Sequence, residues 1–161
     1  MRFVKAIFLM ACLAALGVPQ WSSAAESKND STIVQEVIEA SKAIISAFGA
    51  DDPETYFKLF DPEATFIFYT TQDRLVNRAA YQKEWTSWRH DLGFRVESCK
   101  SSNQLVQLFG DVAILTHFVQ TEITTHAGTE RLDERETIVF HRIKGRWVAV
   151  HEHLSPLPAG S

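Results

Sequence analysis

The last β-strand expected in this chain, residues 146–154, carries the residue best suited to proton chemistry. Side chains alternate between the two faces of a strand. The face that carries Glu152 is otherwise apolar and is formed by Val148, Val150 and Leu154. A carboxyl group in apolar surroundings has a raised pKa and can act as a general acid or base. In the alternative interpretation, Glu152 lies at the rim and pairs with Arg142 or Arg146.

The opposite face of the same strand carries two imidazoles. We expect it to be formed by Trp147, Ala149, His151 and His153. Imidazoles two positions apart can share a metal ion, with a third ligand from His117 or His141. Alternatively, these histidines line a subunit interface and form hydrogen bonds there. The spacing carries no zinc or iron signature, so we predict no metal site and no other cofactor.

A second group of candidate residues is aromatic and consists of Tyr69, Tyr81, Trp85 and Trp88. The last three are spaced i, i+4 and i+7 and therefore share one face of a helix. They can form the aromatic lip of a ligand cavity, in which a tyrosine hydroxyl polarises a ligand carbonyl. Large aromatic residues at helical spacing also form ordinary hydrophobic core, which is the alternative here.

Residues 1–25 have the three-part design of a secretory signal peptide. Arg2 and Lys5 precede an apolar run, residues 6–16, and small residues follow it. This run is too short to cross a bilayer as a permanent helix, which needs roughly 20 residues. We therefore predict an exported protein, periplasmic or secreted, without stable membrane insertion.

The composition of the mature chain limits the classes of partner that we expect it to bind. Export removes Arg2 and Lys5 from the 16 basic residues and leaves 14 against 20 acidic ones. An acidic domain without a basic stripe is not expected to bind nucleic acid. Cys99 is the one cysteine left after Cys12 is removed with the signal, so no internal disulfide is possible. The length suits a single domain that is stabilised by packing.

The elements that must position these residues follow from the apolar pattern. A polar leader, residues 26–31, precedes a helix over 32–48 that begins with the capping box Thr32–Gln35 and ends at Gly49. We predict further helices over 53–60, capped by Asp52, and over 77–89, capped by Asn77. We predict strands over 65–70, 94–99, 104–109, 112–124, 131–142 and 146–154. This order predicts an α+β domain over 32–157, with helices on one side of a curved antiparallel sheet and a short tail, 158–161.

Several turns and strand ends carry motifs typical of one superfamily. These are Asp61-Pro62, Gly110-Asp111-Val112-Ala113, Glu136-Thr137, His141-Arg142, Gly145-x-Trp147 and Val150-His151-x-His153-x-Ser155. Together they resemble the SnoaL-like branch of the nuclear-transport-factor-2-like superfamily. The resemblance is strongest to the association domain of calcium/calmodulin-dependent protein kinase II, and it extends from Ile33 to Pro156.

The resemblance implies a cone-shaped fold, a cystatin-like roll, in which a strongly curved sheet wraps a long N-terminal helix and leaves a pocket at the open end. It also implies that the face with Glu152 looks into the cone. The ligand contacts expected there are Glu136, Ile138, Phe140, Phe118, Leu154, Tyr81 and Trp85. Because Ile138, Leu154 and Phe118 occupy positions where the kinase domain has pocket arginines, the resemblance does not extend to carboxylate binding by an arginine cluster.

The function expected from these observations is binding of a small, largely apolar organic molecule by a homodimer that forms through the outer face of the sheet. One alternative is a proton-transfer enzyme, an isomerase, cyclase or dehydratase. It would use Glu152 as the catalytic acid or base and Tyr69 as the oxyanion donor. A second alternative is a non-catalytic oligomerisation domain, and membership of a fold cannot choose among the three.

Overall fold

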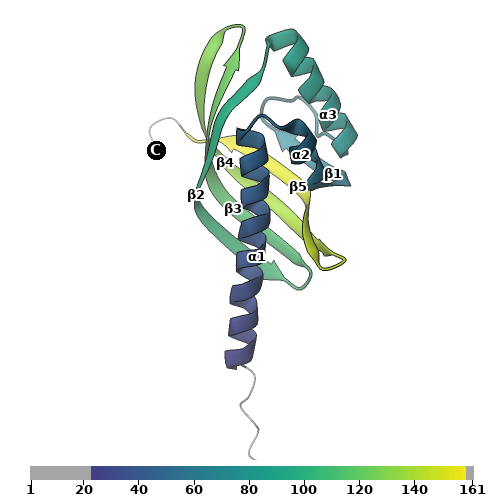
Figure 1. Cartoon of the computed structure of the whole chain (residues 1–161), viewed down its shortest axis with the longest axis vertical. Coiled ribbons are helices and arrows are strands. Elements are labelled where there is room, and N and C mark those ends of the chain that lie inside the picture. Colours follow the sequence, from purple (N-terminus) through teal and green to yellow (C-terminus); the bar gives the residue numbers. More distant parts are fainter. Residues whose placement is uncertain (1–22, 159–161) are drawn as a thin grey trace, which may run out of the picture.

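The computed structural model describes residues 23–158, so most of the predicted signal peptide lies outside the described residues (Figure 1). The helices are α1 (Ser23–Gly49), α2 (Pro53–Lys58), α3 (Arg78–Ser87) and the π-helical segment η1 (Trp88–Leu92). The strands are β1 (Phe60–Phe68), β2 (Arg95–Phe109), β3 (Val112–Thr125), β4 (Gly128–Ile143) and β5 (Arg146–Pro156). Among the described helices, none is both long and apolar enough to cross a membrane.

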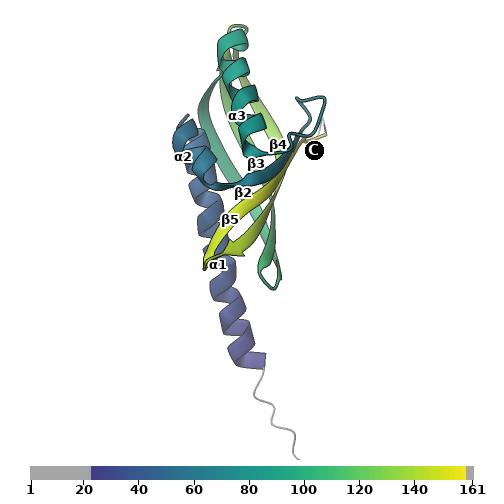
Figure 2. The same ribbon diagram turned by 90° about the vertical axis from the view of Figure 1, so that its right-hand side faces the viewer.

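The five strands form one sheet in the order β1-β5-β4-β3-β2. Strands β2 to β5 are an antiparallel meander, whereas β1 joins the edge parallel to β5. Figures 1 and 2 show that α1 runs along one face of this curved sheet and that α2 and α3 lie at the same face. We call this helix-covered face concave and the opposite face convex. The arrangement is the predicted α+β fold.

Helix α1 begins at Ser23, nine residues before the capping box at Thr32, so the predicted loose leader is helical. Every third or fourth residue of its second half is buried against the sheet: Val37, Ser41, Ile44 and Ala47. The helix ends at Gly49, as predicted. A Cβ atom at Gly49 would lie 2.9 Å from the Cys99 backbone nitrogen, so the glycine permits the close approach of α1 to β2.

The two short helices begin as their sequences predict. The Asp52 side chain caps α2 by accepting a hydrogen bond from the Thr55 amide, and the Asn77 side chain caps α3 by accepting one from the Ala80 amide. The predicted strands 94–99 and 104–109 are instead one strand, β2. The register between β2 and β3 shifts between Ser102 and Leu105. A bulge of this kind allows the pairing of two strands to continue through residues that are typical of turns.

A second bulge lies in β5 and corrects our assignment of its faces. Phe140 pairs with Ala149 and Val139 pairs with His151, so Val150 has no partner in the register. The extra residue shifts the alternation by one position. Ala149 is therefore buried on the concave face, on the same side as Glu152. The predicted common face of Trp147, Ala149, His151 and His153 was wrong, as was the grouping of Val148 and Val150 with Glu152.

The same bulge explains why Trp147 lies on the opposite face from the two histidines. Its ring packs against the core, and its indole nitrogen donates a hydrogen bond to Glu36 of α1 over 3.2 Å. Trp147 thus stands on the helix side of the sheet. The two histidines stay on the convex face, where the His151 Nδ1 atom lies 2.8 Å from the Thr65 hydroxyl and His153 is exposed.

Candidate functional site

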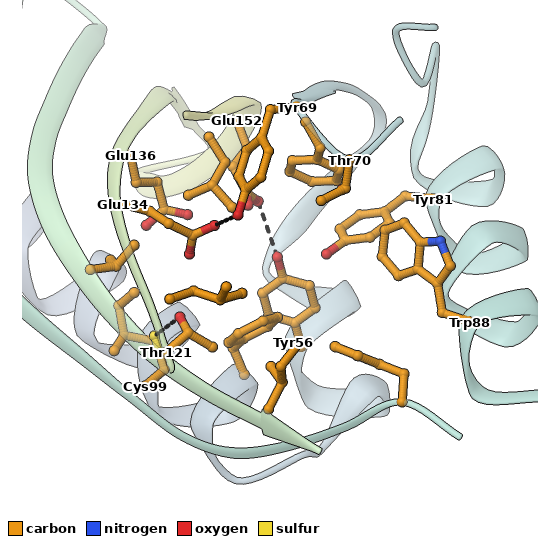
Figure 3. Close-up of a pocket in the computed structure, with 18 of the residues that line it drawn as sticks. Tyr56, Tyr69, Thr70, Tyr81, Trp88, Cys99, Thr121, Glu134, Glu136 and Glu152 are labelled. Carbon is orange, nitrogen blue, oxygen red and sulfur yellow. Dashed lines mark hydrogen bonds between the residues drawn. The ribbon is translucent and has the colours of Figure 1, made fainter. Parts of the chain in front are cut away.

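A cavity of about 240 Å³ lies between α1, the α3–η1 segment and the concave face of the sheet (Figure 3). Most of its wall is apolar, and the aromatic side chains that line it are Phe48, Tyr56, Phe68, Tyr69, Tyr81, Trp88 and Phe94. Three acids complete the lining: Glu134 and Glu136 on β4, and Glu152 on β5. Such a wall, apolar with a few convergent polar groups, is typical of small-molecule sites.

Glu152 lies inside the cone, as the resemblance implied. The residue is 3% exposed, pairs with Ile138 across the hairpin, and accepts a hydrogen bond of 3.0 Å from the Tyr56 hydroxyl. Burial, followed by the neighbouring carboxyl of Glu136, raises the pKa of Glu152 well above its ordinary value. The rim interpretation was wrong, because Arg142 lies 3.6 Å from Glu36 and not against Glu152.

Glu136 lies two positions before Ile138 on the same face of β4 and meets His117 of β3. The His117 Nε2 atom lies 2.5 Å from the Glu136 Oε2 atom, although the two groups are not aligned as a regular hydrogen bond. The His117 Nδ1 atom lies 2.6 Å from the Ser101 hydroxyl oxygen. Burial raises the pKa of Glu136 and lowers the pKa of His117 to about 4.

The short contact between His117 and Glu136 requires a hydrogen between the two atoms, because two lone pairs at this distance repel each other. Glu136, Glu152 and His117 together carry no net charge when they hold two titratable protons. Those protons lie either on both carboxyls or on one carboxyl and the imidazole. A net charge in this buried position is costly. Burial raises the pKa of Glu136 to about 7 and the pKa of Glu152 well above its ordinary value, which favours protonated carboxyls below neutral pH.

Glu134 and Tyr69 form a second polar pair near the mouth. The Tyr69 hydroxyl donates a hydrogen bond of 2.7 Å to the Glu134 Oε1 atom, and Tyr69 is 43% exposed. Burial and then this hydrogen bond raise the pKa of Tyr69, while burial also raises the pKa of Glu134. Tyr69 and Glu152 line the same cavity (Figure 3). The hydroxyl that bonds to Glu152, however, belongs to Tyr56.

The other predicted ligand contacts divide into three groups. Tyr81 and Leu154 line the cavity, together with Glu136. Trp85, Ile138 and Phe140 are buried core residues that do not line it, and Trp88 lines it in place of Trp85. Phe118 was predicted wrongly, because it is 39% exposed on the convex face. The concave positions of β3 are the buried neighbours on either side, His117 and Val119.

Cys99 also lines the cavity, and its sulfur accepts a hydrogen bond of 3.7 Å from the Thr121 hydroxyl. Burial raises the pKa of this thiol to about 12, so it stays protonated and is a poor nucleophile. The described residues contain no group of three side chains that could hold a metal ion. His117, considered as a third metal ligand, contacts Glu136 instead.

Three site residues escaped the sequence analysis. Glu134 could have been found, because Glu134, Glu136 and Ile138 alternate along β4 toward one face. Tyr56 could not, because its hydroxyl reaches Glu152 only through the packing of α2 beneath the sheet. The role of His117 depends on the register Phe118–Arg135 and His117–Glu136 between β3 and β4, which the sequence does not specify.

Comparison with known proteins agrees with this fold. Residues 37–160 match the SnoaL-like domain family, and the chain belongs to that family. A nuclear-transport-factor-2-like superfamily protein from Salmonella enterica is 18% identical, with a TM-score of 0.67 over 82% of this chain and 96% of that one. A protein with a cystatin-like fold from Novosphingobium aromaticivorans is 15% identical, with a TM-score of 0.65 over 88% and 94%.

The hub of a calcium/calmodulin-dependent protein kinase from S. rosetta is also similar in structure. It is 21% identical, with a TM-score of 0.60 over 76% of this chain and 95% of the hub. At these identities the likeness establishes the fold alone. The likeness confirms the predicted cystatin-like roll, and the family match confirms the predicted SnoaL-like membership. Such a domain is suited to a ligand-binding or catalytic pocket.

Proposed function

We propose that this domain binds a small, largely apolar organic molecule in the concave pocket. The observation that carries the proposal is the cavity of about 240 Å³, with aromatic and aliphatic walls and three acids at one place in its lining. Binding sites of this kind hold a ligand by apolar contact and orient it with a few polar groups. The volume limits the ligand to a molecule of modest size.

A pair of neighbouring residues on β3 offers a direct test. Thr121 lines the cavity, whereas Gln120 points to the other face of the sheet. We expect Thr121→Trp to fill the pocket and Gln120→Trp to leave it open. Native mass spectrometry of protein purified from its own host reports the bound ligand. Ligand retained by the Thr121→Trp variant, or absent from all preparations, would argue against the proposal.

A second candidate function is proton transfer, as in an isomerase, cyclase or dehydratase. The buried carboxyl of Glu152 supports it, because a raised pKa suits a group that exchanges protons near neutral pH. After losing its proton, Glu152 would accept one from a carbon next to a ligand carbonyl. The Tyr81 hydroxyl or the Tyr69 hydroxyl would then bond to the developing oxyanion. Loss of ligand hydrogen–deuterium exchange in Glu152→Gln, by nuclear magnetic resonance, tests this.

We further propose a homodimer that forms through the convex face. Large apolar side chains are exposed on or beside this face: Ile67, Leu105, Phe109 and Phe118. Large apolar side chains exposed on one face are candidates for a subunit contact. If the dimer forms and no ligand is found in the pocket, the oligomerisation domain becomes the better description.

Export is a separate proposal, supported by the charged, apolar and small-residue segments of residues 1–25. The intact mass of exported protein should correspond to a chain that begins at Ala25 or Glu26. Retention of Met1 in the exported form would contradict it.

A further inference from the structure

The charges around the pocket are one-sided. The described residues that line it include Glu134, Glu136 and Glu152 but no lysine, arginine or histidine. These acids act across the whole cavity, because they contribute to the raised pKa values of Tyr56 on α2, Tyr81 on α3 and Cys99 on β2. The interior of the pocket therefore has a negative potential whenever one of the acids is ionised.

Glu136 adds a specific acceptor to this potential. The residue is 6% exposed, and its Oε2 atom faces the His117 Nε2 atom at 2.5 Å. Figure 3 shows its carboxyl beside those of Glu134 and Glu152, at the edge of the space that the aromatic side chains enclose. A buried carboxyl at the cavity wall can accept a hydrogen bond from a ligand through the oxygen that does not face His117.

The walls facing these acids are aromatic. Tyr56, Tyr81 and Trp88 line the cavity, and the rings of Tyr81 and Trp88 lie 6.0 Å apart at a steep angle. The faces of such rings attract cations as well as apolar groups. Acids at one end and π-faces along the sides together favour a ligand that has a positive head and an apolar body.

We propose that the ligand is an organic amine, bound as its ammonium ion between Glu136 and Glu152, with its apolar body along Tyr56, Tyr81 and Trp88. This inference names the ligand class of the proposed function and rests on it. An ammonium group has three donors, which match the acceptors of two carboxyls. A carboxylate or phosphate ligand would instead meet three acids in a lining without a basic side chain among the described residues, so we expect it to bind more weakly than the amine.

Amine binding must move a proton. A proton that the buried carboxyls of Glu136 and Glu152 hold leaves when the ammonium ion enters. If the ligand arrives as a neutral amine, an O–H bond of the carboxyl breaks and an N–H bond forms on the ligand. If it arrives as an ammonium ion, the proton is released to solvent.

The groups that face this exchange belong to six elements. They are Glu134 and Glu136 on β4, Glu152 on β5, His117 on β3, Cys99 on β2, Tyr56 on α2 and Tyr81 on α3, with Tyr69 at the mouth. The three tyrosines and the thiol stay protonated near neutral pH, because their pKa values are raised. The carboxyls therefore supply the proton, and the affinity for an ammonium ion rises as the pH rises.

Three probes that share one ring system distinguish a cationic, a neutral and an anionic ligand: naphthylmethylamine, naphthylmethanol and naphthoate. Calorimetry of the full mature protein at pH 7.5 should show the amine binding about tenfold tighter than the alcohol, as expected for a charge-assisted contact, and naphthoate binding more weakly than the amine. Repeating the amine titration in two buffers of different ionisation enthalpy should reveal about one proton released per amine bound. This second measurement uses wild-type protein and does not depend on a variant that folds.

Glu136→Gln/Glu152→Gln should abolish the preference for the amine, whereas Glu122→Gln, the same change at an exposed residue of β3, should keep it. Equal affinity for amine and alcohol in the wild type would overturn the amine inference and leave the proposed function intact. If none of the three probes binds, the result would count against both the amine inference and the proposed function. A preference that persists in the double variant, or amine binding without proton release, would also overturn the inference.

Discussion

Replacing Glu152 by glutamine should stabilise the fold above neutral pH and flatten the dependence of stability on pH. An amide has nearly the shape of the carboxyl and can still accept the hydrogen bond from the Tyr56 hydroxyl. It cannot ionise, however, and a buried carboxylate without a cation is costly. The expected gain is therefore the free energy that the wild type loses when Glu152 gives up its proton.

The sign of this effect follows from the direction of the pKa change. The folded-state pKa of Glu152 lies above its unfolded value of 4.5. The contribution of the group is fully present below the unfolded pKa and is lost as the pH rises toward the folded pKa. One such group costs at most about 1.4 kcal/mol of unfolding free energy per pH unit in this window.

Urea unfolding at pH 5.5, 6.5 and 7.5 measures this difference. The stability of Glu152→Gln relative to the wild type should rise across the series, by at most about 1.4 kcal/mol per pH unit. Glu122→Gln, at an exposed position, should follow the wild type. His117 acts in the opposite sense in both proteins, because its lowered pKa costs stability as the pH falls from 6.5 toward about 4. Parallel curves for wild type and Glu152→Gln would refute the assignment of a buried, protonated Glu152.

Three further perturbations test other parts of the structure. Tyr56→Phe removes the donor to the buried acid and should cost about 1–3 kcal/mol of unfolding free energy, whereas an unchanged urea midpoint would deny that the hydrogen bond matters. Gly49→Ala forces a Cβ atom to within 2.9 Å of the Cys99 amide and should lower the thermal midpoint despite the better helix propensity of alanine. Phe118→Glu on the convex face should give a monomer in light scattering, and a wild type that is already monomeric at micromolar concentration would contradict the proposed dimer.

The fold followed from the sequence wherever local chemistry decides the structure. The caps at Asp52 and Asn77 and the end of α1 at Gly49 are local events, and all three were predicted at the right residues. The two bulges were missed, because an extra residue in a strand has no composition of its own. Their positions depend on the partner strand, which the sequence of one strand does not describe.

The sequence predicted several residues of the site correctly but not the hydrogen bonds between them. Glu152 was placed in the pocket and Tyr69 at its wall, but the hydroxyl expected at Glu152 comes from Tyr56. Helical spacing grouped Trp85 with the pocket aromatics because it shares a face with Tyr81. The structure buries Trp85 in the aromatic core, whereas Tyr81 and Trp88, which were grouped with it, line the cavity. Which residue of a helical face reaches a cavity depends on the distance between layers, and periodicity carries no information on that distance.

The bulge at Val150 divides β5 into two functional halves that are out of phase. On one side of the bulge, Trp147 donates a hydrogen bond to Glu36 of α1. On the other side, Glu152 lies in the pocket and accepts a hydrogen bond from Tyr56. Deleting Val150 would force the strand back to strict alternation and turn one half inside out, so either the indole or the acid would face solvent. A change in length at this position is therefore far more disruptive than one at the hairpin turn Lys144–Gly145, which lies outside both halves.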